Sequence, residues 1–212
     1  MKKALVFLLI LALLTGLALP AFAAQEDPLL TLVNPWNPLP EDWTVELVSI
    51  GNGHKVDSVC YDDLMQMLSD CRAEGLDPQV ASSYRTWDYQ EYLFQRKVNF
   101  YLQKGYGEDQ ARSLAGTVVA VPGTSEHQLG LALDLVDNSN WNLDESQEKT
   151  PVQQWLMKNS WRYGFILRYP NGKSESTGII YEPWHYRYVG KETAKLVYES
   201  GLCLEEYLES LV

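Results

Sequence analysis

Two short motifs in this chain contain residue types that bind catalytic metals. The first, S-E-H-Q-L-G-L-A-L-D, holds His127 and, seven positions later, Asp134. The second, Y-E-P-W-H, holds Glu182 and His185. Two imidazoles and one carboxylate can bind a zinc ion with a position left for water, and a further carboxylate can act as base on that water. The motifs therefore predict three zinc ligands and one general base: His127, Asp134 and His185, with Glu182.

The first motif also indicates how its residues must be positioned. Small and large residues alternate from Gly130 onward, so in a strand Asp134 would lie on one face and Leu133 and Leu135 on the other. An extended chain would separate His127 from Asp134 by roughly 23 Å, at about 3.3 Å per residue. A shared metal requires the chain to fold back between them, and Gly130 is the residue that permits this.

A histidine taken alone is more often structural than a ligand. This chain has only 3 histidines, however, and two of them stand in compact motifs beside acidic residues. The third, His54 in G-N-G-H-K, has turn residues around it and is assigned to a loop.

The two motifs resemble the zinc-ligand signatures of the D-alanyl-D-alanine carboxypeptidases of the VanY type, a family that includes L,D-carboxypeptidases of the same fold. The resemblance continues in S-S-Y-R-T-W-D-Y-Q at residues 82–90, Y-G-F-I-L-R-Y-P at 163–170 and the run through 177–190. It covers roughly residues 33–200. It implies a Zn2+ enzyme that removes the C-terminal D-alanine from peptidoglycan stem peptides.

The resemblance also implies substrate-binding residues. The family places an arginine and a glutamine, here Arg85 and Gln90, where they hold the free carboxyl end and the backbone of the peptide; an arginine fork suits a carboxylate. Ser125 can donate to the same carboxylate, and Trp184 is interpreted as a wall of the pocket. The alternatives are a surface arginine, a glutamine of the capping turn, a serine that braces its turn and a tryptophan of the core.

Other functions stay open at this point. An L,D-carboxypeptidase acting on tetrapeptide stems would differ only in the pocket wall beyond the ligands. A peptidoglycan endopeptidase of the same fold would cut peptides with blocked C-termini. A degenerate module would bind the cell wall without turnover, and an amidohydrolase of unrelated fold would leave the Arg85 and Gln90 motif unexplained.

Taken with the resemblance, the helix and strand signals predict an α+β fold: a single domain whose small central antiparallel sheet carries the zinc site and is flanked by helices. The expected helices are 60–75, 86–103, 108–120, 151–164, 191–200 and 204–211. The expected strands are 80–83, 165–169, 178–181 and one that starts at 130. The last of these is the strand that contains the first motif.

Three segments are expected along the chain. Residues 1–23 predict a secretory signal peptide, with Lys2 and Lys3, an apolar stretch and an A-F-A cleavage pattern; an uncleaved membrane anchor is the alternative. Residues 24–58 predict an extended N-terminal segment held by Trp36 or Trp43. Residues 59–212 form the zinc carboxypeptidase domain. The protein is therefore expected outside the cytoplasmic membrane, in the cell-wall space or periplasm.

The amino-acid composition limits the classes of partner that the protein can bind. The net charge of −11 makes nucleic acid a poor partner, because such binding requires Lys and Arg to neutralise phosphates. No stable protein partner is implied, and a monomer is expected. Cys60 and Cys71 would lie about 16 Å apart on one helix, too far to bridge, so buried free thiols are predicted. A bridge to Cys203 stays open.

Overall fold

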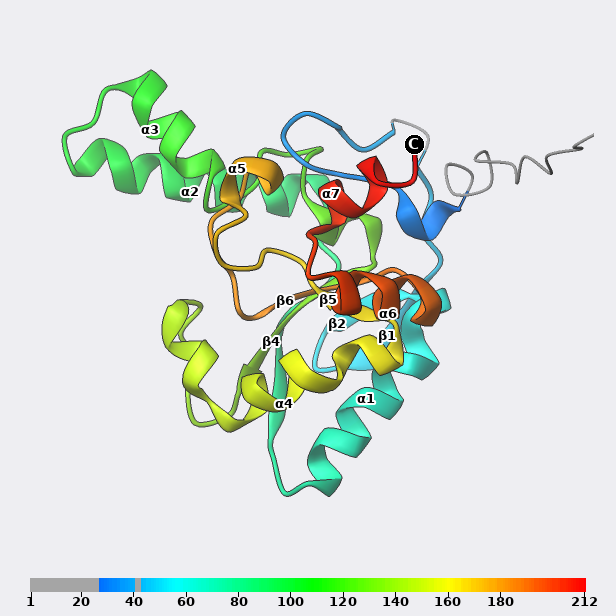
Figure 1. Cartoon of the computed structure of the whole chain (residues 1–212). Coiled ribbons are helices and arrows are strands. Elements are labelled where there is room, and N and C mark those ends of the chain that lie inside the picture. The colour runs from blue at the N-terminus through cyan, green and yellow to red at the C-terminus, as the bar shows by residue number, and fades with distance from the viewer. Residues whose placement is uncertain (1–26, 41–42) are drawn as a thin grey trace, which may run out of the picture.

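The computed structural model describes residues 27–40 and 43–212, so the predicted signal peptide lies outside the described residues. At the centre is a four-stranded antiparallel sheet in the order β3-β4-β6-β5 (Figure 1). Its strands are β3 Pro78–Ser82, β4 Ala132–Asp137, β6 His185–Tyr188 and β5 Phe165–Leu167. The helices are α1 Tyr61–Ala73, α2 Trp87–Gln103, α3 Glu108–Gly116, α4 Pro151–Asn159, α5 Ser174–Thr177, α6 Lys191–Ser200 and α7 Leu204–Glu209. The predicted α+β architecture is confirmed.

The main core lies on the face of β4 that the alternation predicted to be apolar. Leu133 and Leu135 are completely buried there, against Leu64 and Met67 of α1 and Leu156 of α4. Burial of each such side chain contributes about 1.5–3 kcal/mol. This packing fixes which face of β4 is left for Asp134, because adjacent side chains of a strand point in opposite directions.

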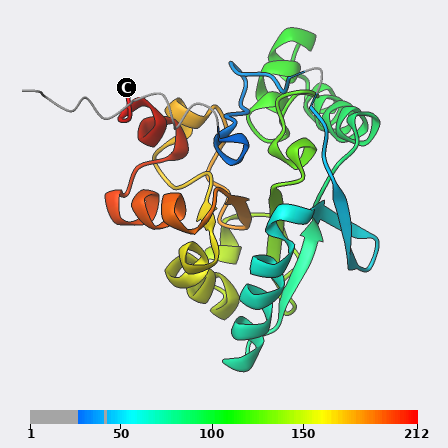
Figure 2. The ribbon, with the colours of Figure 1, turned by 90° about the vertical axis from the view of Figure 1, so that its right-hand side faces the viewer.

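Helices α2 and α3 form a pair that projects from the body of the molecule (Figures 1 and 2). Thr86 caps α2 as predicted, its hydroxyl accepting a hydrogen bond from the backbone N–H of Tyr89 at 3.2 Å. Helix α3 ends at Gly116 instead of continuing to residue 120. Glycine is followed there by the β-branched residues 117–119, and both residue types disfavour a helix.

The N-terminal segment requires a correction, because residues 24–58 do not simply run extended over the domain. They contain a two-stranded antiparallel sheet, β1 Leu47–Gly51 and β2 His54–Asp57, which lies beside α1 and β3 (Figure 2). The turn at Asn52 and Gly53 has positive φ at both residues, the geometry of a two-residue hairpin. His54 therefore opens a strand, and the asparagine–glycine pair was the signal for it.

The N-terminal segment, including the β1–β2 hairpin, also contributes to the domain core. Val33 and Val56 are completely buried in the main hydrophobic cluster. Of the two tryptophans predicted to hold the segment, Trp43 packs against that cluster, whereas Trp36 is 62% exposed. The domain thus begins well before residue 59.

A second correction concerns the strand expected at residues 178–181. These residues are irregular, Gly178 has φ of +75°, and the strand that pairs with β4 is β6, which begins at His185. The short α5 occupies part of the expected hairpin loop. The isoleucines at 179 and 180 resembled a strand, but Pro183 disfavours a paired strand there because it lacks a backbone N–H.

Cys60 and Cys71 are buried and free, as predicted, and Cys203, for which a bridge was left open, is also buried and free. Burial raises the pKa of Cys71 to about 11, so its thiol stays protonated at neutral pH. In the part of the chain that the structure describes, every helix is too short or too polar to cross a membrane.

Candidate active site

The pairing of β4 with β6 brings the two motifs together. Asp134 lies directly opposite His185 in the register of these strands. His127 reaches the same place from a 3-10 helix, Glu126–Leu129, after which Gly130 turns the chain with φ of +76°. A Cβ at Gly130 would come within 2.7 Å of a side-chain methyl of Val45, so the reversal predicted from the sequence depends on glycine.

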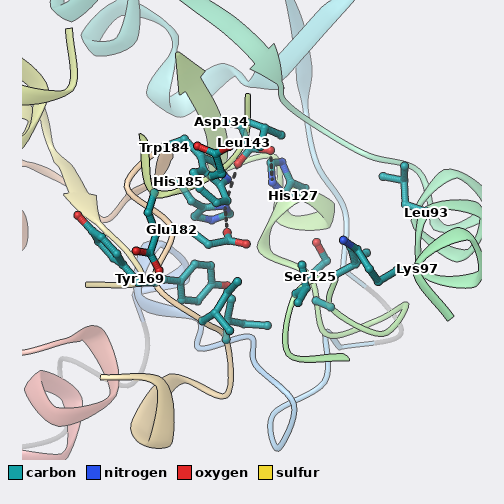
Figure 3. Close-up of a pocket in the computed structure, with 18 of the residues that line it drawn as sticks. Leu93, Lys97, Ser125, His127, Asp134, Leu143, Tyr169, Glu182, Trp184 and His185 are labelled. Atoms are coloured by element: carbon teal, nitrogen blue, oxygen red, sulfur yellow. Dashed lines mark hydrogen bonds and ion pairs between the residues drawn. The ribbon is translucent and has the colours of Figure 1, made fainter. Parts of the chain in front are cut away.

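The three predicted ligands converge. One ligand atom from each of His127, Asp134 and His185 can be chosen so that all lie within 4.8 Å of one another (Figure 3). Nδ1 of His185 is 3.1 Å from Oδ1 of Asp134, and Nε2 of His127 is 3.3 Å from Oδ2. All three residues are buried. Two nitrogens and a carboxylate at this spacing suit a zinc ion with an open coordination position.

The hydrogen bonds of the two imidazoles set which nitrogen is free for a metal. Nδ1 of His127 is 2.8 Å from the carbonyl oxygen of Ser83, to which it donates, so the lone pair of Nε2 faces Asp134. Nε2 of His185 lies 3.5 Å from Oε2 of Glu126, and neither of these two buried atoms has a hydrogen-bond partner among the described residues. A proton on Nε2 leaves Nδ1 as the ligand atom, and such partners commonly orient metal-binding histidines.

Glu126 is itself held by two completely buried arginines. Its Oε1 accepts hydrogen bonds from Nε of Arg168 at 2.7 Å and from Nη1 of Arg187 at 2.8 Å. The other two nitrogens of Arg168 form a bidentate pair with Glu205 of α7. This network was not predicted from the sequence. The pattern that could have indicated it is a charged residue inside an otherwise apolar strand, as in F-I-L-R-Y and H-Y-R-Y.

The electrostatics of the ligands follow from these contacts. Burial lowers the pKa of His127 to about 4. Burial alone would also lower the pKa of His185, but its hydrogen bonds to Asp134 and Glu126 raise it to about 9. The pKa of Asp134 is held well below its usual value by the two histidines and Arg85, against the effect of burial. The protein alone therefore carries a proton on His185 at neutral pH, which a metal must displace.

Glu182 lies beside this centre without being part of the three-residue cluster. Its Oε2 is 3.7 Å from Nδ1 of His185, and its backbone N–H donates to the carbonyl oxygen of Tyr169. Burial raises the pKa of Glu182 to about 8, and Asp134 adds to the rise. A carboxylate whose pKa is near the working pH can both take up and return a proton.

Arg85 and Gln90 lie at the start of α2 as expected, but of the two only Arg85 lines the cavity. Arg85 donates to Ser82 and Asp134, at 2.9 Å and 2.8 Å, and to Gln90 at 3.3 Å, which leaves two of its five N–H groups free at the cavity. Gln90 is completely buried, and its amide nitrogen donates to the carbonyl oxygen of Ala120. The prediction that Gln90 contacts the peptide is corrected, because its amide oxygen accepts from Arg85 while its amide nitrogen donates to Ala120.

Ser125 and Trp184 both line the cavity that contains the site. The side chain of Ser125 does not cap the 3-10 helix that follows it, so its hydroxyl is available to a ligand. The cavity has a volume of about 840 Å³, within the range of sites that enclose a small ligand or a short peptide. A buried two-histidine, one-aspartate centre beside a poised carboxylate in such a cavity has the chemistry of a metallohydrolase.

Comparisons with known proteins agree with this class. The family model of VanY, D-alanyl-D-alanine carboxypeptidase, matches residues 53–191. A D-alanyl-D-alanine carboxypeptidase of Enterococcus faecalis (strain ATCC 700802 / V583) is 49% identical over 186 residues, which are 88% of this chain and 68% of the relative. The chain therefore belongs to the VanY family of D-alanyl-D-alanine carboxypeptidases.

Two solved structures are similar over most of their length. One is a glutamate-to-alanine mutant of the vancomycin resistance D,D-pentapeptidase VanY in complex with Zn(II), with a TM-score of 0.78, 47% identity, and coverage of 86% of this chain and 99% of that one. The other is VanYB in complex with D-alanine-D-alanine, with a TM-score of 0.78, 48% identity, and coverage of 85% and 97%.

Proposed function

We propose that this protein is a zinc-dependent D,D-carboxypeptidase that removes the terminal D-alanine from peptidoglycan stem peptides. The observation that carries the proposal is the convergence of His127, Asp134 and His185 around one point, with Glu182 beside them in an open cavity. The zinc and D-alanine-D-alanine complexes of similar structures support the choice of metal and substrate.

Nε2 of His127, Nδ1 of His185 and the carboxylate of Asp134 would hold the ion. A bound zinc ion supplies Lewis-acid chemistry, because it polarises the scissile carbonyl and acidifies an attacking water. Glu182 accepts the proton of that water and returns it to the departing amine. The burial that raises the pKa of Glu182 also makes it a competent proton donor in that second step.

Restriction to the last residue requires an anchor for the free carboxylate of the peptide. Arg85 has two free N–H groups at the cavity, and Ser125 has a free hydroxyl. Together they would hold the carboxylate about one residue from the metal, and Gln90 acts by fixing the arginine. Trp184 would close one wall of the pocket. Such positioning contributes to the rate because it presents one amide bond to the reactive groups.

We also propose the cellular compartment in which the enzyme acts. Residues 1–23 would direct export, so that the protein acts on the cell wall as a secreted or N-terminally anchored monomer. Detection of the processed chain outside the cytoplasmic membrane, by mass spectrometry of cell fractions, tests the export. Sedimentation of the purified chain tests the monomer.

The decisive experiment for the activity uses purified protein, zinc and two stem peptides, one ending in D-alanyl-D-alanine and one tetrapeptide with an L,D bond. Release of one D-alanine from the pentapeptide supports the proposal, whereas exclusive cleavage of the tetrapeptide would establish the L,D alternative. Cleavage of a C-terminally amidated peptide at the same rate would indicate an endopeptidase. No turnover by a zinc-loaded, folded sample would indicate a binding module.

Glu182→Gln gives the matched mechanistic test. The amide cannot accept the proton, so we expect kcat to fall by about 100-fold or more. Zinc content, measured by atomic absorption, should stay near one ion per chain because Glu182 is not a ligand in this assignment. A variant with undiminished turnover would remove Glu182 from the reaction, and one without zinc would make it a ligand.

A further inference from the structure

The cavity at the metal site has a charged outer part that the proposed reaction does not use. Leu93, Arg96, Lys97 and Phe100 line it from α2. These positions share one face of the helix, because residues three and four apart are neighbours. From Leu93 to Phe100 the face extends about 10 Å at 1.5 Å per residue. That is the length of roughly three residues of extended peptide.

Lys97 is a half-buried cation to which the described residues supply no anionic partner. Lys173, Lys191 and Lys195 each lie within 2.9 Å of a carboxylate oxygen. Among residues 27–40 and 43–212, no carboxylate lies within ion-pair distance of Lys97; the ammonium lies 5.4 Å from the ring centre of Phe100. Figure 3 shows the side chain reaching from α2 toward the cavity, on the side of Ser125.

The surroundings of Lys97 favour an incoming anion. Burial lowers its pKa, and the largest opposing influence on that pKa is the carboxylate of Glu182, which belongs to the reaction. A cation that has lost part of its hydration is stabilised when a carboxylate pairs with it. Arg96 adds a second positive charge at the rim, and it too has no carboxylate within ion-pair distance in the described part of the chain.

Acidic residues line another part of the cavity. Asp144 and Glu145 lie at the start of the 3-10 helix Glu145–Lys149, outside α2, so an anionic group entering the cavity would be directed toward α2. The chain as a whole carries a charge of −11. Within this cavity the cations come from α2, whereas Asp144 and Glu145 come from a different segment of the chain.

We propose that Lys97, assisted by Arg96, binds a carboxylate that the peptide substrate carries upstream of the scissile bond. The inference rests on the proposed function, in which Arg85 and Ser125 hold the terminal carboxylate, and it adds that the rest of the peptide leaves the metal centre along α2. In a stem peptide whose second residue is D-glutamate joined through its γ-carboxyl group, the free α-carboxylate is such a group. Its carboxamide has the same shape but no charge.

The test compares three substrates: L-Ala-γ-D-Glu-L-Lys-D-Ala-D-Ala, the same peptide with D-isoglutamine, and diacetyl-L-Lys-D-Ala-D-Ala, which lacks the second residue. We expect kcat/KM of the natural protein to be about tenfold higher for the carboxylate peptide than for the carboxamide. Lys97→Met keeps the apolar stem and should abolish this preference while leaving the short substrate unchanged. Lys97→Arg should retain it.

Lys195→Ala is the matched control, since it removes one lysine charge from α6, away from the cavity, and should keep the tenfold preference. Equal rates on the two pentapeptides with the natural protein would overturn the inference. So would a Lys97→Met variant that loses as much activity on the short substrate, because Lys97 would then act at the terminal carboxylate. Failure of the proposed function is distinct: no substrate would then be cleaved by the natural protein.

Discussion

Replacing Glu126 by glutamine should weaken zinc binding while leaving the fold in place. Arg168 and Arg187 both donate to Oε1 of Glu126, so a glutamine must place its amide oxygen there. Its NH2 group then faces Nε2 of His185, where Oε2 lies at 3.5 Å. Because an amide NH2 only donates, Nε2 must accept, and the ring proton moves to Nδ1, the nitrogen that faces Asp134.

The expected losses of zinc affinity and of fold stability follow from the two functions of Glu126, which orients His185 and pairs with Arg168 and Arg187. Loss of such an orienting partner typically lowers metal affinity by about 10–100-fold, which is about 1.4–2.8 kcal/mol. The loss of a charge-assisted acceptor should destabilise the fold by about 1.5–3 kcal/mol. Arg168 keeps Glu205, and Arg187 keeps the carbonyl oxygens of Leu29 and Thr31, so neither guanidinium is left alone. In a chain of this size the melting temperature should fall by about 3–12 °C.

Zinc affinity is measured by competition with a chromophoric chelator. The proton position is measured by 15N NMR of the histidine rings in the metal-free protein, at a pH well above the His185 pKa of about 9, where the ring is neutral. Glu205→Gln is the control: it disturbs the same Arg168 but does not contact His185, so it should lower the melting temperature without changing zinc affinity. The reasoning is refuted if Glu126→Gln binds zinc within twofold of the natural protein, or if its His185 still carries the proton on Nε2 alone.

Three further predictions concern the turn at Gly130, the pH dependence of stability and the release of protons on zinc binding. Gly130→Ala should destabilise the fold by about 2–4 kcal/mol in urea denaturation, because φ is positive and the new Cβ meets Val45 and the backbone of Asp57. Gly172→Ala, where φ is also positive but the surrounding space is open, should destabilise it by only about 1 kcal/mol. Equal losses of stability in the two variants would contradict the close packing at Gly130. In EDTA the protein should lose stability as pH rises from about 6.5 to 9, because the folded-state pKa values of His185 and Glu182, about 9 and about 8, are raised above their ordinary values and the native state therefore binds more protons. Zinc addition near pH 7.5 should release at least about one proton, measured by titration in weak buffer, and uptake without release would contradict the protonation assigned to His185.

The sequence by itself determined the chemistry of the site and the local elements around it. The residue types of the ligands and base stand in two compact motifs, and the alternation after Gly130 fixed which face of β4 carries Asp134. Helix α2 begins where Thr86 predicted it, and α6 has the predicted bounds. These features were accessible because caps, glycine turns and hydrophobic alternation act over a few neighbouring residues.

Only the tertiary structure decided how distant segments meet. The placement of β6 at His185, the occupation of the Gln90 amide and the approach of Glu126 to Nε2 of His185 each join residues at least 30 positions apart. A local sequence pattern cannot predict which distant segments pair, because many segments have the same strand or helix propensity and the pairing is decided by burial. The motifs name the ligands of a metal, whereas the buried arginines and glutamates set which atom each ligand presents.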